Sequence, residues 1–341
     1  MATGADATGV GDVGEVRSFG SVGMPLKVTG AIAVIVGVVF LAMTMVNNLF
    51  EVGPAFEEMI DDFRPVLTDE SLDTARADIA TLEAAGTEFQ TVVGPAMAQA
   101  LGMTPEQFGG MVQSNYPAVA QGMEALPTIT QTFSGLIDTL DSQGDLFASA
   151  DAIPTNDLPA NTVPWIIAIS GVVALGLGVM MFKPGRIWAM LALALGVILV
   201  ISTVVLSLPQ KAADADELNE NLTEVYTQEL IDGANQSLAV IGAMGEEMQT
   251  KMLPDLAAQL GMTQDELNAF MGQNFPATAA AMQSMPESLP RFQAFVGVFD
   301  ANLDNYETIQ PVAFTPIIWT FLFGGLLIAL SSGYCVLTKQ S

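Results

Sequence analysis

The chain has 341 residues, of which 51% are apolar and only 14% are charged, and its 37 Asp and Glu against 10 Lys and Arg give a net charge of −27. Such acidity makes nucleic acid and anionic lipid headgroups poor partners. There is one cysteine, Cys335, so no intramolecular disulfide can form and the folded parts depend on packing alone. This cysteine usage favours a bacterial envelope protein over a cystine-rich secreted protein.

Four segments have the length and composition of transmembrane helices. Val28–Val46, Val163–Phe182 and Ile187–Leu208 carry no charge over 19, 20 and 22 residues. A fourth uncharged stretch runs from Thr308 to Thr338. A helix needs about 20 apolar residues to cross a bilayer core about 30 Å thick. The sequence therefore predicts a membrane protein with four spans.

Basic residues lie beside these spans, whereas the two long segments between spans are acidic. Residues 47–163 have a net charge of −16, and residues 209–310 have a net charge of −13. Half of the basic residues lie in the short remainder of the chain: Arg17, Lys27, Lys183, Arg186 and Lys339. Cytoplasmic loops collect Lys and Arg. We therefore expect a plasma membrane protein with both termini in the cytoplasm and two acidic domains outside, either as solvated surfaces or as surfaces that collect cations.

The expected organisation follows from these two patterns. It comprises a disordered cytoplasmic tail (1–26), span 1 (27–47), a first acidic domain (48–162), span 2 (163–182), a cytoplasmic turn (183–186), span 3 (187–208), a second acidic domain (209–310), span 4 (311–337) and a short cytoplasmic tail (338–341).

The most specific feature of the sequence is an internal repeat at an offset of 159 residues. The block Leu101–Thr104 (LGMT) recurs as Leu260–Thr263, and the correspondence runs without a gap for 119 residues. Each copy enters the membrane from the cytoplasm and returns to it. The repeat therefore predicts two parallel homologous units related by a pseudo-twofold axis along the membrane normal.

Both acidic segments are expected to be helical, which makes the predicted fold all-α. Good helix formers dominate them, and the alternation typical of strands is scarce. Thr104 to Gln107 places a proline at a first helical position, and Thr263 to Glu266 has the pattern of a capping box. About four short helices in each domain are expected, separated by prolines at 117, 127, 276, 286 and 290.

The residue types argue against an enzyme. Histidine is absent, which removes Ser-His and Cys-His nucleophile pairs and zinc sites built on His or Cys. None of the four spans contains the ionisable residue that ion-coupled carriers usually place at mid-membrane.

Small residues recur every four positions in two spans and predict close helix packing. These candidate packing residues are Ser170, Ala174 and Gly178 in span 2, and Gly325, Ala329 and Gly333 in span 4. The partner is either another helix of the same bundle, or a second copy or other subunit.

Two further patterns point to ligands. The motif D-x-[QN]-x-D occurs as Asp141 to Asp145 and as Asp300 to Asp304, and it resembles half of a calcium loop, although no glycine or glutamate completes it. It predicts either a calcium site, with Asp141, Asp145, Asp300 and Asp304 as ligands, or a polar linker. The 19 methionines suggest copper ligands, a groove for lipid or peptide, or packing. Met123 recurs as Met282 whereas Leu126 recurs as Met285, an exchange that favours packing.

No cofactor other than calcium is expected. The leading hypothesis is a non-enzymatic scaffold or accessory subunit of the cell envelope, which binds a protein partner, or a second copy, through its outer domains. The alternative is an accessory protein for lipids or other small hydrophobic molecules, with an apolar groove in the outer domains.

Overall fold

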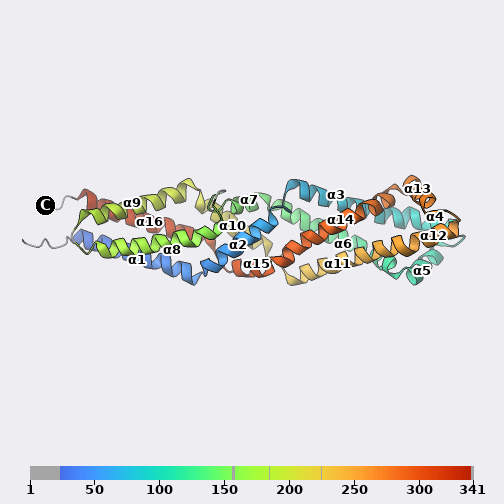
Figure 1. The fold of residues 1–341 in the computed structure, drawn as a ribbon, viewed down its shortest axis with the longest axis horizontal. Coiled ribbons are helices and arrows are strands. Elements are labelled where there is room, and N and C mark those ends of the chain that lie inside the picture. Colours follow the sequence, from blue (N-terminus) through green and yellow to red (C-terminus); the bar gives the residue numbers. More distant parts are fainter. Residues whose placement is uncertain (1–23, 156–157, 184, 224, 339–341) are drawn as a thin grey trace, which may run out of the picture. The chain divides into compact units, whose positions relative to one another are not determined.

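The computed structural model describes residues 24–155, 158–183, 185–223 and 225–338 (Figure 1). The described part is helical throughout; it contains no β-strand, and its one bridge pairs Thr155 with Leu158. The prediction of an all-α chain is confirmed.

Four helices are long and apolar enough to cross a bilayer. They are α1 (Met24–Val46), α8 (Val163–Met180), α9 (Arg186–Val205) and α16 (Phe314–Leu337). Helix α1 begins three residues before the predicted start of span 1 at residue 27. Residues 1–23 of the predicted N-terminal tail, residue 184 of the turn and residues 339–341 lie outside the described residues.

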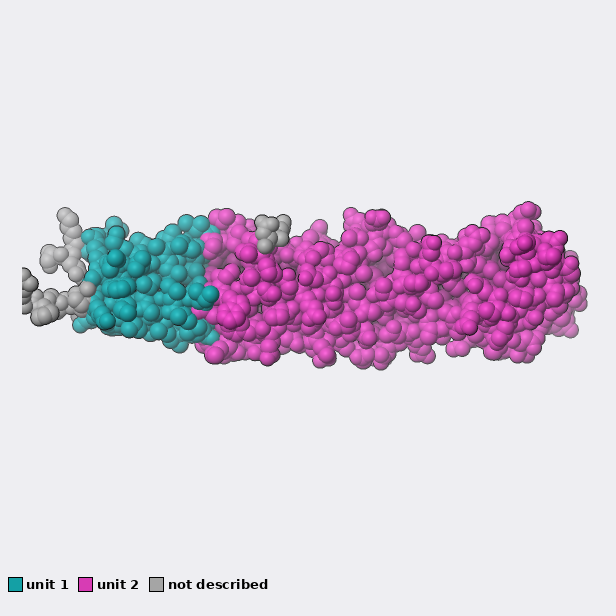
Figure 2. All heavy atoms as spheres, in the orientation of Figure 1, with its two compact units in different colours: residues 1–41, 169–201, 322–341 teal, residues 42–168, 202–321 magenta. Residues whose placement is uncertain are grey.

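The chain divides into two compact units, which Figure 2 colours separately. Unit 1 contains residues 1–41, 169–201 and 322–341, and unit 2 contains residues 42–168 and 202–321. Unit 1 therefore holds most of the four span helices. Unit 2 holds both acidic segments together, so the two stretches expected as separate domains contribute to one compact unit.

Unit 1 is held together by pairs of helices that touch at glycine. A Cβ atom added to Gly37 of α1 would lie 2.6 Å from the Gly171 carbonyl oxygen of α8, and one added to Gly178 would lie 2.7 Å from the Gly30 carbonyl oxygen. Gly196 of α9 faces Gly325 and Ala329 of α16 in the same way. Backbone contact of this kind drives association in lipid, where the hydrophobic effect between helices is lost.

Polar contacts join α1 to α16 within unit 1. The Thr29 hydroxyl donates to the Ser331 carbonyl oxygen at 3.1 Å and lies 3.1 Å from the Cys335 sulfur.

Unit 2 begins with the helices of the first acidic segment. They are α2 (Leu49–Phe63), α3 (Asp69–Glu88), the π-helix η1 (Phe89–Val93), α4 (Gly94–Ala100), α5 (Pro105–Asn115), α6 (Pro117–Ser142), α7 (Gly144–Asp151) and the 3-10 helix η2 (Ala160–Thr162). The second segment supplies α10 (Leu208–Leu222), α11 (Gln228–Glu247), the π-helix η3 (Met248–Met252), α12 (Leu253–Leu260), α13 (Gln264–Asn274), α14 (Pro276–Ala301) and α15 (Leu303–Ile309).

The helix boundaries of the two segments correspond. Helix α3 begins at Asp69 and α11 begins at Gln228, 159 residues later, and the same interval separates the starts of α2 and α10, α5 and α13, and α6 and α14. Non-glycine residues with positive φ, Asn48 (52°) and Ser207 (53°), lie at the matching bends that precede α2 and α10.

The two segments interleave along unit 2 rather than folding side by side. Helix α3 packs along α14, and α6 packs along α11, and these contacts join the two segments (Figure 1). Helices α3 and α6 also pack on each other, as do α11 and α14, so the four long helices form one bundle. Helices α2 and α15 pair in the same crossed manner, as do α7 and α10. Phe133 of α6 contacts Phe292 of α14 with ring centroids 5.3 Å apart.

Two details of the predicted helices need correction. Each segment forms six α-helices rather than about four. Pro117 and Pro276 do begin helices, but Pro127, Pro286 and Pro290 lie inside α6 and α14. Both of those helices run for 26 residues. A proline removes one backbone hydrogen bond, and the crossed packing along the full length of these helices offsets that loss.

The predicted capping signals at residues 104 and 263 are confirmed. Thr104 and Gln107 form a capping box at the start of α5, and Thr263 and Glu266 form one at the start of α13.

Carboxylates of each segment also cap the long helix of the other. Glu247, at the end of α11, accepts from the backbone N–H groups of Ala118 (2.7 Å) and Val119 (3.1 Å) in the first turn of α6. Glu88, at the end of α3, accepts from the N–H group of Thr278 (2.7 Å) in the first turn of α14. First-turn N–H groups have no acceptor in their own helix, so these reciprocal contacts tie the two segments together.

We expect Gly37→Leu to lower the stability of the folded protein in detergent by about 1–3 kcal/mol, because the added side chain would collide with the α8 backbone. The matched control is Gly176→Leu, since no atom lies within 4 Å of a Cβ added at Gly176. Thermal melting followed by circular dichroism measures both variants. Equal stability of the two would contradict the proposed role of the glycine contact.

We expect Glu247→Gln to lower the melting temperature by several degrees at pH 7 because it weakens the cap on α6. Burial raises the pKa of Glu247, but the hydrogen bonds from Lys251, Val119 and Ala118 outweigh burial and lower that pKa below its ordinary value of 4.5. A carboxylate whose folded-state pKa is depressed stabilises the fold above its unfolded-state pKa. That contribution is lost as the pH falls through the folded-state pKa.

The difference in melting temperature between wild type and Glu247→Gln should therefore narrow below about pH 4.5. The neighbouring Glu246 is exposed and makes no ion pair within the described residues, so Glu246→Gln is the control. If the two variants melt alike at pH 7, the carboxylate of Glu247 does not stabilise α6.

Candidate functional site

One end of unit 2 is formed by α4, α5, α12 and α13 (Figure 1), and it has a common core. We call this the distal end; it comprises residues 89–120 and 248–285. Its core is rich in methionine: Met97, Met248, Met252 and Met271 are buried. The distal end carries a net charge of −3, whereas the rest of the two acidic segments carries −26.

A groove of about 420 Å³ opens on the distal end, and we call it the amide groove. It is lined by four amide side chains and four apolar ones: Gln249, Gln264, Asn268, Gln283, Leu253, Met271, Ala279 and Met282. The four amides are exposed and make no side-chain hydrogen bond to any described residue. No charged residue lines the groove.

The groove combines neutral hydrogen-bonding groups with an apolar floor. Each amide offers a carbonyl acceptor and an NH₂ donor, so the set can pair with the N–H and C=O groups of an extended peptide. Methionine side chains adapt to different apolar partners. This chemistry suits an uncharged peptide segment.

The corresponding positions of the first segment lack this set. Gln249 has an amide counterpart in Gln90, but Gln264, Asn268 and Gln283 correspond to Pro105, Gly109 and Glu124. The amide groove is therefore specific to the second segment.

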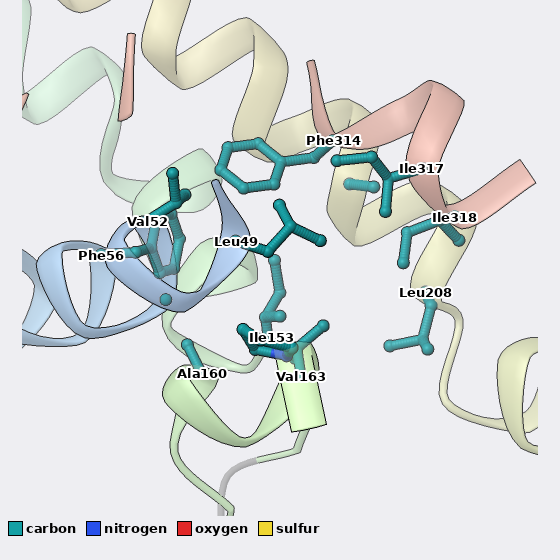
Figure 3. Close-up of a pocket in the computed structure, with 13 residues that line it drawn as sticks. Leu49, Val52, Phe56, Ile153, Ala160, Val163, Leu208, Phe314, Ile317 and Ile318 are labelled. Atoms are coloured by element: carbon teal, nitrogen blue, oxygen red, sulfur yellow. The ribbon is translucent and has the colours of Figure 1, made fainter. Parts of the chain in front are cut away.

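A second cavity lies at the opposite end of unit 2, where the chain leads into α8 and α16, and we call it the apolar pocket (Figure 3). Its volume is about 60 Å³. The lining comes from four regions and is apolar throughout: Leu49, Val52, Gly53, Phe56, Ile153, Ala160, Val163, Pro164, Leu208, Ala212, Phe314, Ile317 and Ile318. Figure 3 shows the side chains of Leu49, Phe314 and Ile317 turned toward the same space.

Carboxylates anchor the walls of the apolar pocket. Asp216 of α10 accepts from the N–H groups of Phe314 (2.7 Å) and Thr315 (2.8 Å) at the start of α16. Glu57 of α2 accepts from the N–H group of Ala160 just before α8. Negative charge at a helix N-terminus is favourable, so both contacts hold the start of a span against the preceding helix.

Lys211 lies beside the apolar pocket. Its ammonium group donates to the carbonyl oxygens of Ala152 (2.5 Å) and Pro154 (3.3 Å), the residues on either side of the lining residue Ile153. Partial burial lowers the pKa of Lys211. The described residues place no carboxylate within 4 Å of this ammonium group.

The structure does not bring the four predicted calcium ligands together. Asp141 (α6), Asp145 (α7), Asp300 (α14) and Asp304 (α15) are all exposed. Asp141 is paired with Arg76 at 2.8 Å. Within the described residues no group of three or more acidic, histidine or cysteine side chains could hold a metal ion. Calcium binding stays a prediction.

Most of the small residues that were predicted to pack lie where two helices of unit 1 touch. Gly178 faces α1, whereas Gly325 and Ala329 face α9. Ser170 and Ala174 are buried in α8. Gly333 is looser: the nearest atom to a Cβ added there is Leu193 Cδ1, at 3.7 Å.

Met285, which lies 159 residues after Leu126, is a packing residue. Leu126 of α6 covers Gly86 of α3, and Met285 of α14 covers the corresponding glycine, Gly245 of α11. The side chains thus occupy equivalent positions in the two segments.

Comparison of the chain with family models, curated proteins and solved structures finds no match. The function of the chain is therefore inferred from its own geometry.

Sequence reasoning missed both cavities. A signal for the amide groove was visible in the sequence. Gln264, Asn268 and Gln283 carry amides, whereas the residues 159 positions earlier do not. The apolar pocket had no comparable signal, because its lining comes from residues 49 to 318 and each residue alone is an ordinary core side chain.

Proposed function

We propose that this protein is a non-enzymatic membrane scaffold of the cell envelope, which binds a protein partner through the distal end of unit 2. The amide groove is the observation that supports this proposal. It is open and has no charged lining residue, and its four amides make no side-chain hydrogen bond to any described residue, whereas the rest of the chain is strongly acidic. An extended, uncharged segment of the partner pairs with these amides and covers Met271 and Met282.

The proposed topology places both termini in the cytoplasm and unit 2 outside. It is supported by the basic residues beside the spans, Lys27, Lys183, Arg186 and Lys339, and by the acidic surface of unit 2.

We further propose that the chain arose by duplication, with its halves related by a pseudo-twofold axis along the membrane normal. The shared interval of 159 residues between helix starts supports this origin. So do the reciprocal caps, because Glu88 and Glu247 are separated by the same interval, as are Val119 and Thr278. Only one half carries the amide groove, which is what specialisation after duplication would produce.

The topology predicts different labelling of two introduced cysteines. In a Cys335→Ser background, Ser142→Cys should react with a membrane-impermeant thiol reagent on intact cells, and Ser341→Cys should react only after permeabilisation. The reverse pattern would place unit 2 in the cytoplasm.

If the partner binds in the amide groove, substitutions of its amides should weaken binding. A triple variant, Gln264→Glu, Asn268→Asp and Gln283→Glu, keeps the side-chain shapes but introduces three carboxylates. We expect it to reduce capture of the partner from detergent extracts at least tenfold, because carboxylates cannot donate and their desolvation is costly.

The control is the pair Gln99→Glu and Gln113→Glu, which adds charge to exposed positions of the distal end outside the groove. Capture quantified by mass spectrometry should be unchanged in the control. If both variants lose the partner equally, general acidity explains the effect and the groove is not the site. If neither loses it, the partner binds elsewhere.

A further inference from the structure

The residues in and around the apolar pocket are of the kinds expected at a membrane–water interface. Val163, Pro164, Ile317 and Ile318 line it, and they belong to the first two turns of two helices that qualify as spans. Trp165 and Trp319 lie in the same opening turns and are 60% and 42% exposed. Tryptophan is enriched where a span meets the headgroup region. Phe50 adds a third exposed ring, and its centroid lies 4.9 Å from the ring centroid of Trp165.

The lining of the pocket selects an apolar occupant. A buried water needs two to four polar partners, and none of the 13 lining side chains is polar. The volume of about 60 Å³ is small, roughly twice the share of one water molecule in the liquid. It has room for a few methylene groups rather than for a ring system.

The mouth of the pocket is built from lining residues that stay partly exposed, namely Ile153, Val163, Leu208 and Phe314. In the bilayer this depth is occupied by the ester-proximal part of the lipid acyl chains. The commonest apolar molecule beside the pocket is therefore a membrane lipid.

Lys211 places a positive charge beside the pocket, and a purely apolar molecule would have no group to pair with it. It follows Leu208 on α10 and precedes Ala212, which both line the pocket, and it is held against the backbone on either side of Ile153. In a chain with 37 acidic residues, this ammonium group has no carboxylate within ion-pair distance among the described residues. A lipid phosphate has the complementary charge and lies at the same depth as the tryptophans.

We propose that the apolar pocket binds one phospholipid of the leaflet in which α8 and α16 begin, with the ester-proximal segment of an acyl chain inside the pocket and the phosphate beside Lys211. This site is independent of the amide groove and of the proposed scaffold function. The bound chain fills the space between α2, α10 and the starts of two spans.

The test uses the full-length protein in phosphatidylcholine vesicles that contain a trace of photoreactive phospholipid. One probe carries a diazirine near the ester end of an acyl chain, and the other carries it at the methyl end. After irradiation, mass spectrometry of peptides should find adducts on Leu49, Ile153 or Leu208 with the first probe. The second probe should label exposed span residues such as Leu330, which is 64% exposed.

Two variants give the site a specific signature. Ala212→Phe fills the pocket and should reduce pocket adducts at least fivefold while adducts on Leu330 persist. Lys211→Gln keeps the pocket open and should reduce pocket adducts of a phosphatidylglycerol probe about threefold or more. The control Leu330→Phe changes an exposed position of α16 and should leave pocket adducts unchanged. Circular dichroism and gel filtration establish that each variant is folded.

Three results would overturn the proposal. The first is an absence of pocket adducts with the ester-proximal probe on the wild-type protein. The second is pocket labelling that survives in folded Ala212→Phe or, if that variant does not fold, labelling that is unaffected by Lys211→Gln. The third is pocket labelling by a photoreactive free fatty acid but by no phospholipid, which would make the occupant a different hydrophobic molecule.

Discussion

The reciprocal capping of α6 and α14 is the contact on which unit 2 depends. Each of these 26-residue helices opens with N–H groups that need an acceptor. The acceptors are Glu247 and Glu88, which belong to the opposite segments. The crossed packing of α3 with α14 and of α6 with α11 follows the same exchange. Neither segment alone contains the partner that its long helix requires, so the two make one unit.

This interleaving gives the two ends of unit 2 different roles. The charged side chains gather along the middle and at the end that leads into the spans, whereas the distal end is almost neutral and carries the amide groove. The apolar pocket lies at the other end, where Glu57 and Asp216 hold the starts of α8 and α16 in place. A partner and a lipid would thus bind at separate surfaces, each defined by helices from a rigid packed core.

Differences between the segments matter as much as their similarity. The exchange of Leu126 for Met285 preserves a contact with glycine and leaves the packing unchanged. The exchange of Gly109 for Asn268 instead adds an amide to an exposed groove, and the exchange of Val52 for Lys211 places a cation beside the apolar pocket. The functional hypotheses depend on these unequal positions.

The sequence by itself determined the features that depend on local chemistry. Uncharged runs of about 20 residues identified the four candidate spans, and the Thr104 and Thr263 caps identified the starts of α5 and α13. Only the tertiary structure decided that Pro127, Pro286 and Pro290 would remain within helices, because packing against a neighbouring helix outweighs the loss of one hydrogen bond. The crossed pairing, the amide groove and the apolar pocket were likewise decided in three dimensions. The crossed pairing and the apolar pocket depend on residues far apart in the chain, and a local pattern carries no information about such contacts.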